Sequence, residues 1–181
     1  MRSWRKFDIY LVIVLFVITL GYFFYTHASA ESKGIERYSS ALEIYKTGDY
    51  EKAYQDFGKI PAASSLKIPA LFRQARCAAN LNKKDLAIKK YKRIVHSKSK
   101  SSIVPISEYS MANLMFELND KHSKKVFAHI IKKYPSSSYA VASEYYLGLI
   151  EIDNLPSKPK KLAKAKESAF NHFKKYLEKY K

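Results

Sequence analysis

The feature that most constrains how this chain can fold is a set of spaced residues that occurs again 34 positions later. The set combines aromatic, small and branched apolar residues with one turn residue. Its first copy is Tyr38, Ala41, Gly48, Ala53, Phe57 and Ile60, and its second copy is Phe72, Ala75, Asn82, Ala87, Tyr91 and Ile94. A fixed period of about 20–50 residues is typical of repeat architectures, in which each unit packs against its neighbours.

Two further copies follow at longer spacings. The third copy carries Tyr109, Ala112, Ser123, Phe127 and Ile130, and the fourth carries Tyr145, Gly148, Ala169, Phe173 and Tyr176. The additional residues fall around the polar segments SKSKSS and NLPSKPKK, which we assign to the loops between helices. Because insertions in loops leave the helices intact, the sequence predicts four copies of one structural unit.

Each copy predicts two amphipathic helices joined by a short polar turn. In the first helix the aromatic residue and the small residue three positions later, such as Tyr38 and Ala41, share one face. In the second helix Ala53, Phe57 and Ile60 step by four and three, which again marks one face. Alternating β-branched runs are absent outside the apolar N-terminal segment, so no strand is predicted. The predicted fold class is therefore all-α.

A helix pair repeated every 34 residues, with GDYEKA opening the second helix, resembles the tetratricopeptide repeat. The segment IIKKYPSSSYAVASEYYLG, from Ile130 to Gly148, resembles that family's junction between repeats. The resemblance covers nearly all of residues 31–181 and implies an α-solenoid of about four helix pairs. The chain departs from the family at the turn glycine, which is replaced by Asn82 in copy two and by Asn119 in copy three.

The first thirty residues differ in kind from this repeat domain. Arg2, Arg5 and Lys6 precede an uncharged run of seventeen residues, Ile9 to Tyr25. A helix of that length covers about 26 Å, close to the ~30 Å hydrocarbon core of a bilayer. Positive charges before such a helix keep the N-terminus in the cytoplasm. We therefore expect residues 1–30 to form a single-pass anchor in the inner membrane, with the repeat domain in the periplasm or outside the cell.

A second interpretation of this segment stays open. Ala28, Ser29 and Ala30 have the small-x-small form of a signal-peptidase site, and cleavage after Ala30 would give a secreted or periplasmic protein. The anchor is favoured because the apolar run exceeds the ~7–15 residues of a signal-peptide core. Aromatic residues such as Trp4 and Tyr10 also stand where interfacial belts occur. Both interpretations export the repeat domain.

The sequence gives no pattern for catalysis, for a metal or for a cofactor. His122 and His129 stand seven residues apart, which is not the spacing of a zinc site. Cys77 is the only cysteine, and on an apolar helix its simplest role is that of a small buried residue. No phosphate loop and no nucleophile elbow occurs. We expect a binding protein that needs no cofactor.

One candidate binding surface follows from the repeat register. In stacked helix pairs the first helices line the concave side, and their outward polar residues form a groove. At offsets i, i+3 and i+7 in copies two and three, these residues are Arg73, Arg76, Asn80, Ser110, Asn113 and Glu117. Guanidinium and amide groups can hold a peptide backbone or a carboxylate, so we expect an envelope protein or peptide in this groove. The alternative is an ordinary polar surface.

A second candidate surface is basic. The chain has a net charge of +17, and Lys158 to Lys181 contains nine lysines but only two glutamates. Exposed lysines favour diffuse anionic surfaces, so we expect weak contact with peptidoglycan or anionic lipid. The residues expected to make it are Lys160, Lys161, Lys164 and Lys166. Nucleic acid is not expected as a partner because the domain is exported, and a solvated basic face is the alternative.

Two functions fit these observations. The amino-acid sequence of the repeats is similar to that of periplasmic repeat proteins of outer-membrane assembly. This resemblance implies a membrane-anchored scaffold for protein–protein interactions in envelope biogenesis. The sequence is also similar to the helical N-terminal region of soluble lytic murein transglycosylases, which implies a non-catalytic part of such an enzyme with its catalytic domain beyond Lys181. Glu167 in ESAF imitates the start of that enzyme motif, but no Gly-Leu-Met-Gln follows. A general-acid role for Glu167 is therefore not predicted.

Overall fold

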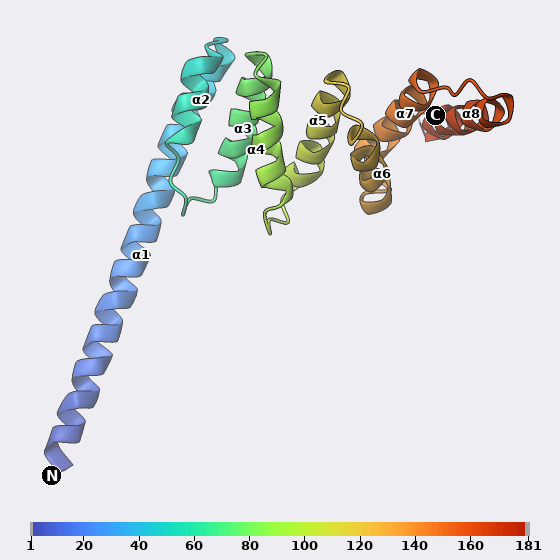
Figure 1. Cartoon of the computed structure of the whole chain (residues 1–181). Coiled ribbons are helices and arrows are strands. Elements are labelled where there is room, and N and C mark those ends of the chain that lie inside the picture. The colour runs from blue at the N-terminus through green and yellow to red at the C-terminus, as the bar shows by residue number, and fades with distance from the viewer. Residues whose placement is uncertain (1, 180–181) are drawn as a thin grey trace. The chain divides into compact units, whose positions relative to one another are not determined.

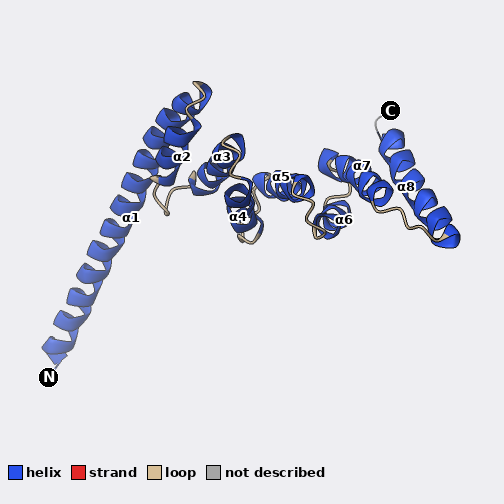
Figure 2. Ribbon diagram, turned by 45° about the horizontal axis from the view of Figure 1, so that its top comes forward, coloured by secondary structure: helices blue, strands red, loops and turns tan. Residues whose placement is uncertain are grey.

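The computed structural model describes the backbone of residues 2–179 and the side chains of residues 9–179. The predicted roles of Arg2, Trp4, Arg5 and Lys6 therefore lie outside the described side chains, as does Lys181. Within the described range the chain forms helices and no strand, which confirms the all-α class (Figures 1 and 2). The helices are α1 (Arg2–Lys46), α2 (Tyr50–Gly58), α3 (Lys67–Asn80), α4 (Lys84–Val95), α5 (Ile103–Glu117), α6 (Ser123–Lys133), α7 (Ser138–Asp153) and α8 (Pro159–Lys179).

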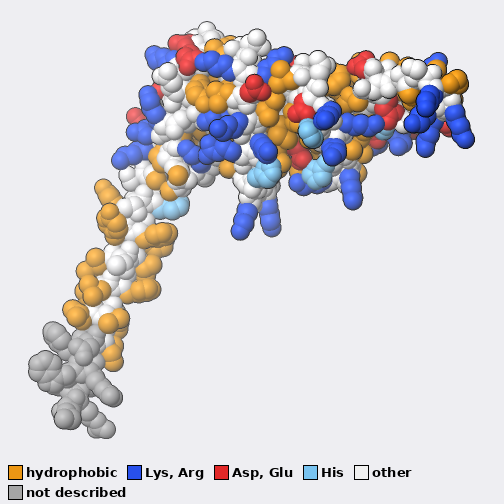
Figure 3. All heavy atoms as spheres, in the orientation of Figure 1, with side chains coloured by type: hydrophobic (Ala, Val, Ile, Leu, Met, Phe, Trp, Pro, Cys, Tyr) orange, Lys and Arg blue, Asp and Glu red, His pale blue; other side chains and the backbone are white. Residues whose placement is uncertain are grey.

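Helix α1 is an uninterrupted helix of 45 residues that contains both the apolar segment and the first helix of copy one. Side chains from Ile9 to Ala28 are all exposed, and Figure 3 shows the apolar ones along this stretch. In the described range α1 is the one helix long and apolar enough to cross a membrane. None of its most apolar window is buried by the protein, so this segment is not a core helix.

The chain divides into two compact units, Met1–Gln74 and Ala75–Lys181, and each is described by itself. In the first unit, the end of α1 packs against α2 as predicted for copy one. Ala41 and Ala53 are fully buried, and the rings of Tyr38 and Phe57 lie 5.4 Å apart. Small residues let the two helices approach while the aromatic pair fills the space beside them, which stabilises the pair by a few kcal/mol.

The turns between paired helices follow the predicted chemistry. Gly48 has φ = 86°, and Asn82 and Asn119 have φ = 57° and 56°. This left-handed region is open to glycine, and asparagine enters it at lower cost than most residues do. The predicted replacement of the turn glycine by Asn82 and Asn119 is therefore confirmed.

In the second unit each of the helices from α4 to α8 packs against the next one along the chain, and α5 also contacts α7. Copy three keeps its predicted register, since Ala112, Phe127 and Ile130 are fully buried and belong to one apolar cluster with Leu147. Copy four also keeps its predicted register, since Ala169 is buried and Gly148 packs against the ring of Phe173. The packing is close, because a Cβ added to Gly148 would lie 2.7 Å from that ring. Copy four therefore has glycine where copy three has Ala112.

One expectation about copy four is wrong. We assigned its ten added residues to a loop, but the loop between α7 and α8 is short, residues 154–158. The added residues instead lengthen α8 at its start. Ala169 is the eleventh residue of α8, whereas Ala53 and Ala87 are each the fourth residue of their helices. Pro159 stands first in α8, where a residue without an N–H group costs nothing, and lysine and alanine favour the added turns.

Candidate partner-binding site

The predicted groove residues fall in both units. Arg73 belongs to the first unit, and Tyr38 and Tyr45 hold it there. Its Nε donates to the hydroxyl of Tyr38 at 3.4 Å, and its guanidinium lies 5.5 Å from the centre of the Tyr45 ring. Such a cation–π contact fixes the direction of a long side chain. Arg73 therefore presents a guanidinium already positioned by the first repeat.

The remaining predicted groove residues lie on α3 and α5 in the second unit. Arg76 and Asn80 are exposed near the end of α3, and Glu117 is exposed at the end of α5. Lys84 of α4 donates to Glu117 at 2.8 Å, so this carboxylate is paired across two helices. An exposed pair of this kind contributes at most about 1 kcal/mol to stability.

Asn113 and Ser110 are half-buried on the same helix, α5. The side-chain oxygen of Asn113 is buried and has no hydrogen-bond partner in the described part of the chain. A buried acceptor without a donor costs about 1–3 kcal/mol, and a peptide N–H reaches this oxygen only after the side chain turns toward the surface. In the described conformation Asn113 therefore does not offer its oxygen to a partner.

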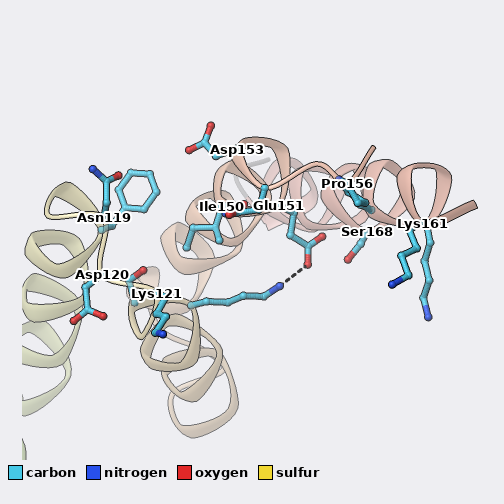
Figure 4. A pocket seen from close by; sticks show the side chains of 15 residues that line it. Asn119, Asp120, Lys121, Ile150, Glu151, Asp153, Pro156, Lys161 and Ser168 are labelled. Carbon is cyan, nitrogen blue, oxygen red and sulfur yellow. Dashed lines mark hydrogen bonds and ion pairs between the residues drawn. The ribbon is translucent and has the colours of Figure 1, made fainter. Parts of the chain in front are cut away.

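The four predicted lysines all lie exposed on the first half of α8, but they do not share one environment. Lys161 and Lys164 line a hollow of about 780 Å³, whereas Lys160 and Lys166 do not (Figure 4). The other residues around this hollow come from the end of α5, the α5–α6 turn, the start of α6, the end of α7, the α7–α8 loop and the first half of α8. They are Phe116, Asn119, Asp120, Lys121, Ser123, Lys124, Ile150, Glu151, Asp153, Asn154, Pro156, Ala165 and Ser168.

Glu151 is the most enclosed carboxylate of this hollow. Its Oε1 accepts from Lys124 Nζ at 3.2 Å, drawn as a dashed line in Figure 4. Its Oε2 is buried and has no hydrogen-bond partner among the described residues. Burial acts to raise the pKa of Glu151, but the Ser168 hydroxyl and Lys124 outweigh it, and the pKa lies below the ordinary value of 4.5. Glu151 is therefore charged at neutral pH.

Two buried glutamates escaped the sequence analysis. Glu108 of α5 and Glu144 of α7 are only 3% and 4% exposed. His129 Nδ1 donates to Glu108 at 2.6 Å, and His172 Nδ1 donates to Glu144 at 2.5 Å. A buried carboxylate is retained only where a partner compensates its charge, and here each partner comes from the second helix of the same pair.

The signal that could have found these glutamates is a repeated triplet. Ser-Glu-Tyr stands at residues 107–109 and again at 143–145, 36 positions apart. Both serines are fully buried and donate back to their own helices, Ser107 to the carbonyl of Ile103 and Ser143 to that of Tyr139. A polar triplet conserved between copies within the apolar face of a helix indicates buried, paired groups.

Comparison with known proteins supports the tetratricopeptide-type fold. Residues 69–99, in copy two, match the family described as Tetratricopeptide repeat. Among solved structures, one described as "MamA RS-1 ArsTM double mutant" is similar, with 14% sequence identity and a TM-score of 0.60. That similarity covers 80% of this chain and 74% of the other. No curated protein matches the chain.

These findings concern the fold and the helical repeats alone. Repeats of this kind generally bind protein partners, so a protein-interaction role is the one they support. They do not bear on the resemblance to lytic transglycosylases, which stays a prediction.

Proposed function

We propose that this chain is a membrane-anchored scaffold whose repeat domain, residues 31–181, holds a partner protein in cell-envelope biogenesis. The observation that carries the proposal is the combination of tetratricopeptide-type helix pairs with the exposed apolar segment of α1. An exposed run of apolar side chains this long is unstable in water and stable in lipid. The same combination fits an interaction module held at a membrane.

Contacts around the predicted cleavage position favour a retained anchor over a cleaved signal. Helix α1 continues without a break through Ala30. The carboxylate of Glu31 then accepts from the backbone N–H of Ser65 at 2.8 Å and from its hydroxyl at 2.5 Å, and these bonds lower the pKa of Glu31. Gly34 is buried directly against Ser64. In the folded chain this part of α1 is tied down, and a helix held in this way is a poor substrate for a protease.

The groove residues supply the chemistry for a peptide partner. Arg76 and Asn80 provide donors at the surface of α3, and the half-buried Asn113 of α5 provides a side-chain amide that a partner reaches if it turns outward. A peptide in extended form offers both N–H and C=O groups, so such a surface can bind its backbone without a demand on its side chains. We include in the proposal a weaker, salt-sensitive adhesion of α8 to anionic wall polymer or lipid.

The experiment is a pull-down from membranes with the full chain in an uncharged detergent. We expect the double variant Arg76→Ala, Asn113→Ala to recover its partner at least about tenfold less well than the unchanged chain. The matched control is Lys52→Ala, Gln55→Ala, which removes two exposed side chains of α2. Equal recovery by both double variants would show that the groove is not the binding surface.

A further inference from the structure

The hollow beside α8 exists because copy four departs from the repeat. The added first turns of α8 carry Lys161, Lys164 and Ala165, and all three line the hollow. The opposite side is formed by the α5–α6 turn and the last turn of α7, which belong to the ordinary repeat. The hollow is therefore built from a segment that the second helices of copies one to three do not have.

Some of the charged side chains around this hollow have a partner of opposite charge, and others do not. Asp120 accepts from the backbone N–H and the Nδ1 of His122, at 2.9 and 2.7 Å, and these bonds lower its pKa. Glu151 is paired with Lys124. In contrast, Lys161 and Lys164 form no ion pair in the described part of the chain. Two cations on one helix face, three residues apart, are left to meet an anionic group from outside.

The hollow also offers apolar surface and room. Phe116, Ile150 and Ala165 are half-buried beside it, and Pro156 of the α7–α8 loop also lines it. A volume of about 780 Å³ lies within the ~300–1,000 Å³ of ordinary ligand sites. An occupant that covers these side chains gains hydrophobic free energy as well as charge pairing.

We propose that this hollow binds an acidic peptide, in which a carboxylate meets Lys161 and Lys164 while a neighbouring apolar side chain covers Phe116 and Ile150. A uniform polyanion fits less well, because Asp120, Glu151 and Asp153 line the same hollow and repel it.

This inference rests on the proposed scaffold function and gives the scaffold a docking site separate from the groove. The predicted groove is formed by residues of α3 and α5, whereas this hollow depends on the added turns of α8. A scaffold with two such sites can hold two partners, or two segments of one partner, at the same time.

The lysines of α8 provide a matched test. Lys161→Gln with Lys164→Gln and Lys160→Gln with Lys166→Gln each remove two positive charges from the same exposed half of one helix. The probe is a fluorescein-labelled peptide with a single aspartate beside a leucine, otherwise of glycine and serine. Its binding to the full chain in an uncharged detergent is followed by fluorescence anisotropy. We expect the first variant to weaken binding at least about tenfold and the second less than about twofold.

A third variant tests the hollow without changing charge. Ala165→Phe places a large side chain on the lining, and we expect it to weaken binding of the same peptide at least about fivefold. A matched peptide with asparagine in place of the aspartate should bind about tenfold less tightly than the aspartate peptide. Circular dichroism of each variant checks that the helices are retained.

Several results would overturn the inference. Equal losses in the two lysine variants would show diffuse attraction to a basic helix, and no loss in either would place the peptide elsewhere. Competition by phosphatidylglycerol in mixed detergent micelles that depends on Lys161 and Lys164 would show a lipid site instead. Absence of peptide binding, with the membrane pull-down still dependent on Arg76 and Asn113, would reject this site and leave the scaffold function standing.

Discussion

Helices α6 and α8 are the second helices of neighbouring copies, yet their surroundings differ. Helix α6 lies between α5 and α7, and its Phe127 and Ile130 are fully buried. Helix α8 packs on α7, and its corresponding Phe173 and Tyr176 are only half-buried. In the described part of the chain, the same spacing of residues is therefore covered by helices on two sides in α6 and on one side in α8.

This difference separates residues that set the packing of the helices from residues that line the hollow. Residues that keep the register, such as Phe127 and Ala169, decide where the helices lie. Residues outside the register, such as Lys161 and Lys164, are free to build a site. Substitutions at equivalent positions of α6 and α8 test the prediction that the two helices contribute differently to stability.

The largest effect is expected at the buried aromatic residues. Phe127→Ala should lower the free energy of unfolding by about 3–5 kcal/mol, because it leaves a cavity in a closed cluster. Phe173→Ala should cost less than about 2 kcal/mol, because that ring is half-buried. Urea unfolding of the full chain in detergent, followed by circular dichroism, measures both. Equal costs would contradict the difference between α6 and α8.

The small residue of each first helix gives the next comparison. Gly148→Ala should destabilise copy four by at most about 2 kcal/mol, because the contact of the new Cβ with the Phe173 ring is offset by about 1 kcal/mol of helix propensity. Ala112→Gly in copy three should cost about 1 kcal/mol through helix propensity and lost packing. Thermal unfolding of the two variants measures these values, and relief of the Gly148→Ala defect by Phe173→Leu would identify the ring as its cause.

A smaller effect is expected from Glu151 and depends on pH. Its pKa is lower in the folded chain than its ordinary value of 4.5, so its charge stabilises the fold above that pH. The contribution fades as the pH falls through the folded pKa. Glu151→Gln should therefore reduce stability by about 1 kcal/mol at pH 7 and have less effect at the acidic end of the range. A pH-independent loss would show that packing, and not charge, is responsible.

The smallest effect is expected on the outer face of α8. Leu177 is 60% exposed, so Leu177→Ala should change stability by less than about 0.5 kcal/mol. Ile131 of α6 is half-buried in the cluster covered by α7, and Ile131→Ala should cost about 2 kcal/mol. Differential scanning calorimetry of both variants measures the two stability losses. A large loss at Leu177 would reveal a neighbour that covers this face.

Much of the fold could be predicted because the register depends on local physical chemistry. Small and aromatic residues recur with the period of a helix face, and Asn82 and Asn119 take the left-handed turns. The long start of α8 was missed, although Pro159 at a first helical position and the following lysines and alanines favour a helix. The sequence analysis assigns the segment NLPSKPKK to a loop, whereas α8 begins inside that segment at Pro159.

The candidate sites were less predictable because they depend on tertiary packing. The sequence cannot show that Lys161 and Lys164 face a hollow while Lys160 and Lys166 do not, since all four are exposed lysines. The unpaired oxygen of Asn113 likewise depends on which side chains surround it. Spacing along one helix selects a face, but the neighbours of that face come from other helices.

The continuity of α1 has a mechanical consequence. Its apolar segment and the first helix of copy one form one rod without a loop, a proline or a glycine turn between them. From Ala28 to Lys46 this rod extends about 27 Å, and helices bend only gently over such lengths. If the apolar segment spans the bilayer as proposed, a tilt of this segment in the lipid also tilts the first repeat, because both belong to one helix. The first repeat would then respond to membrane thickness through the angle of a single helix.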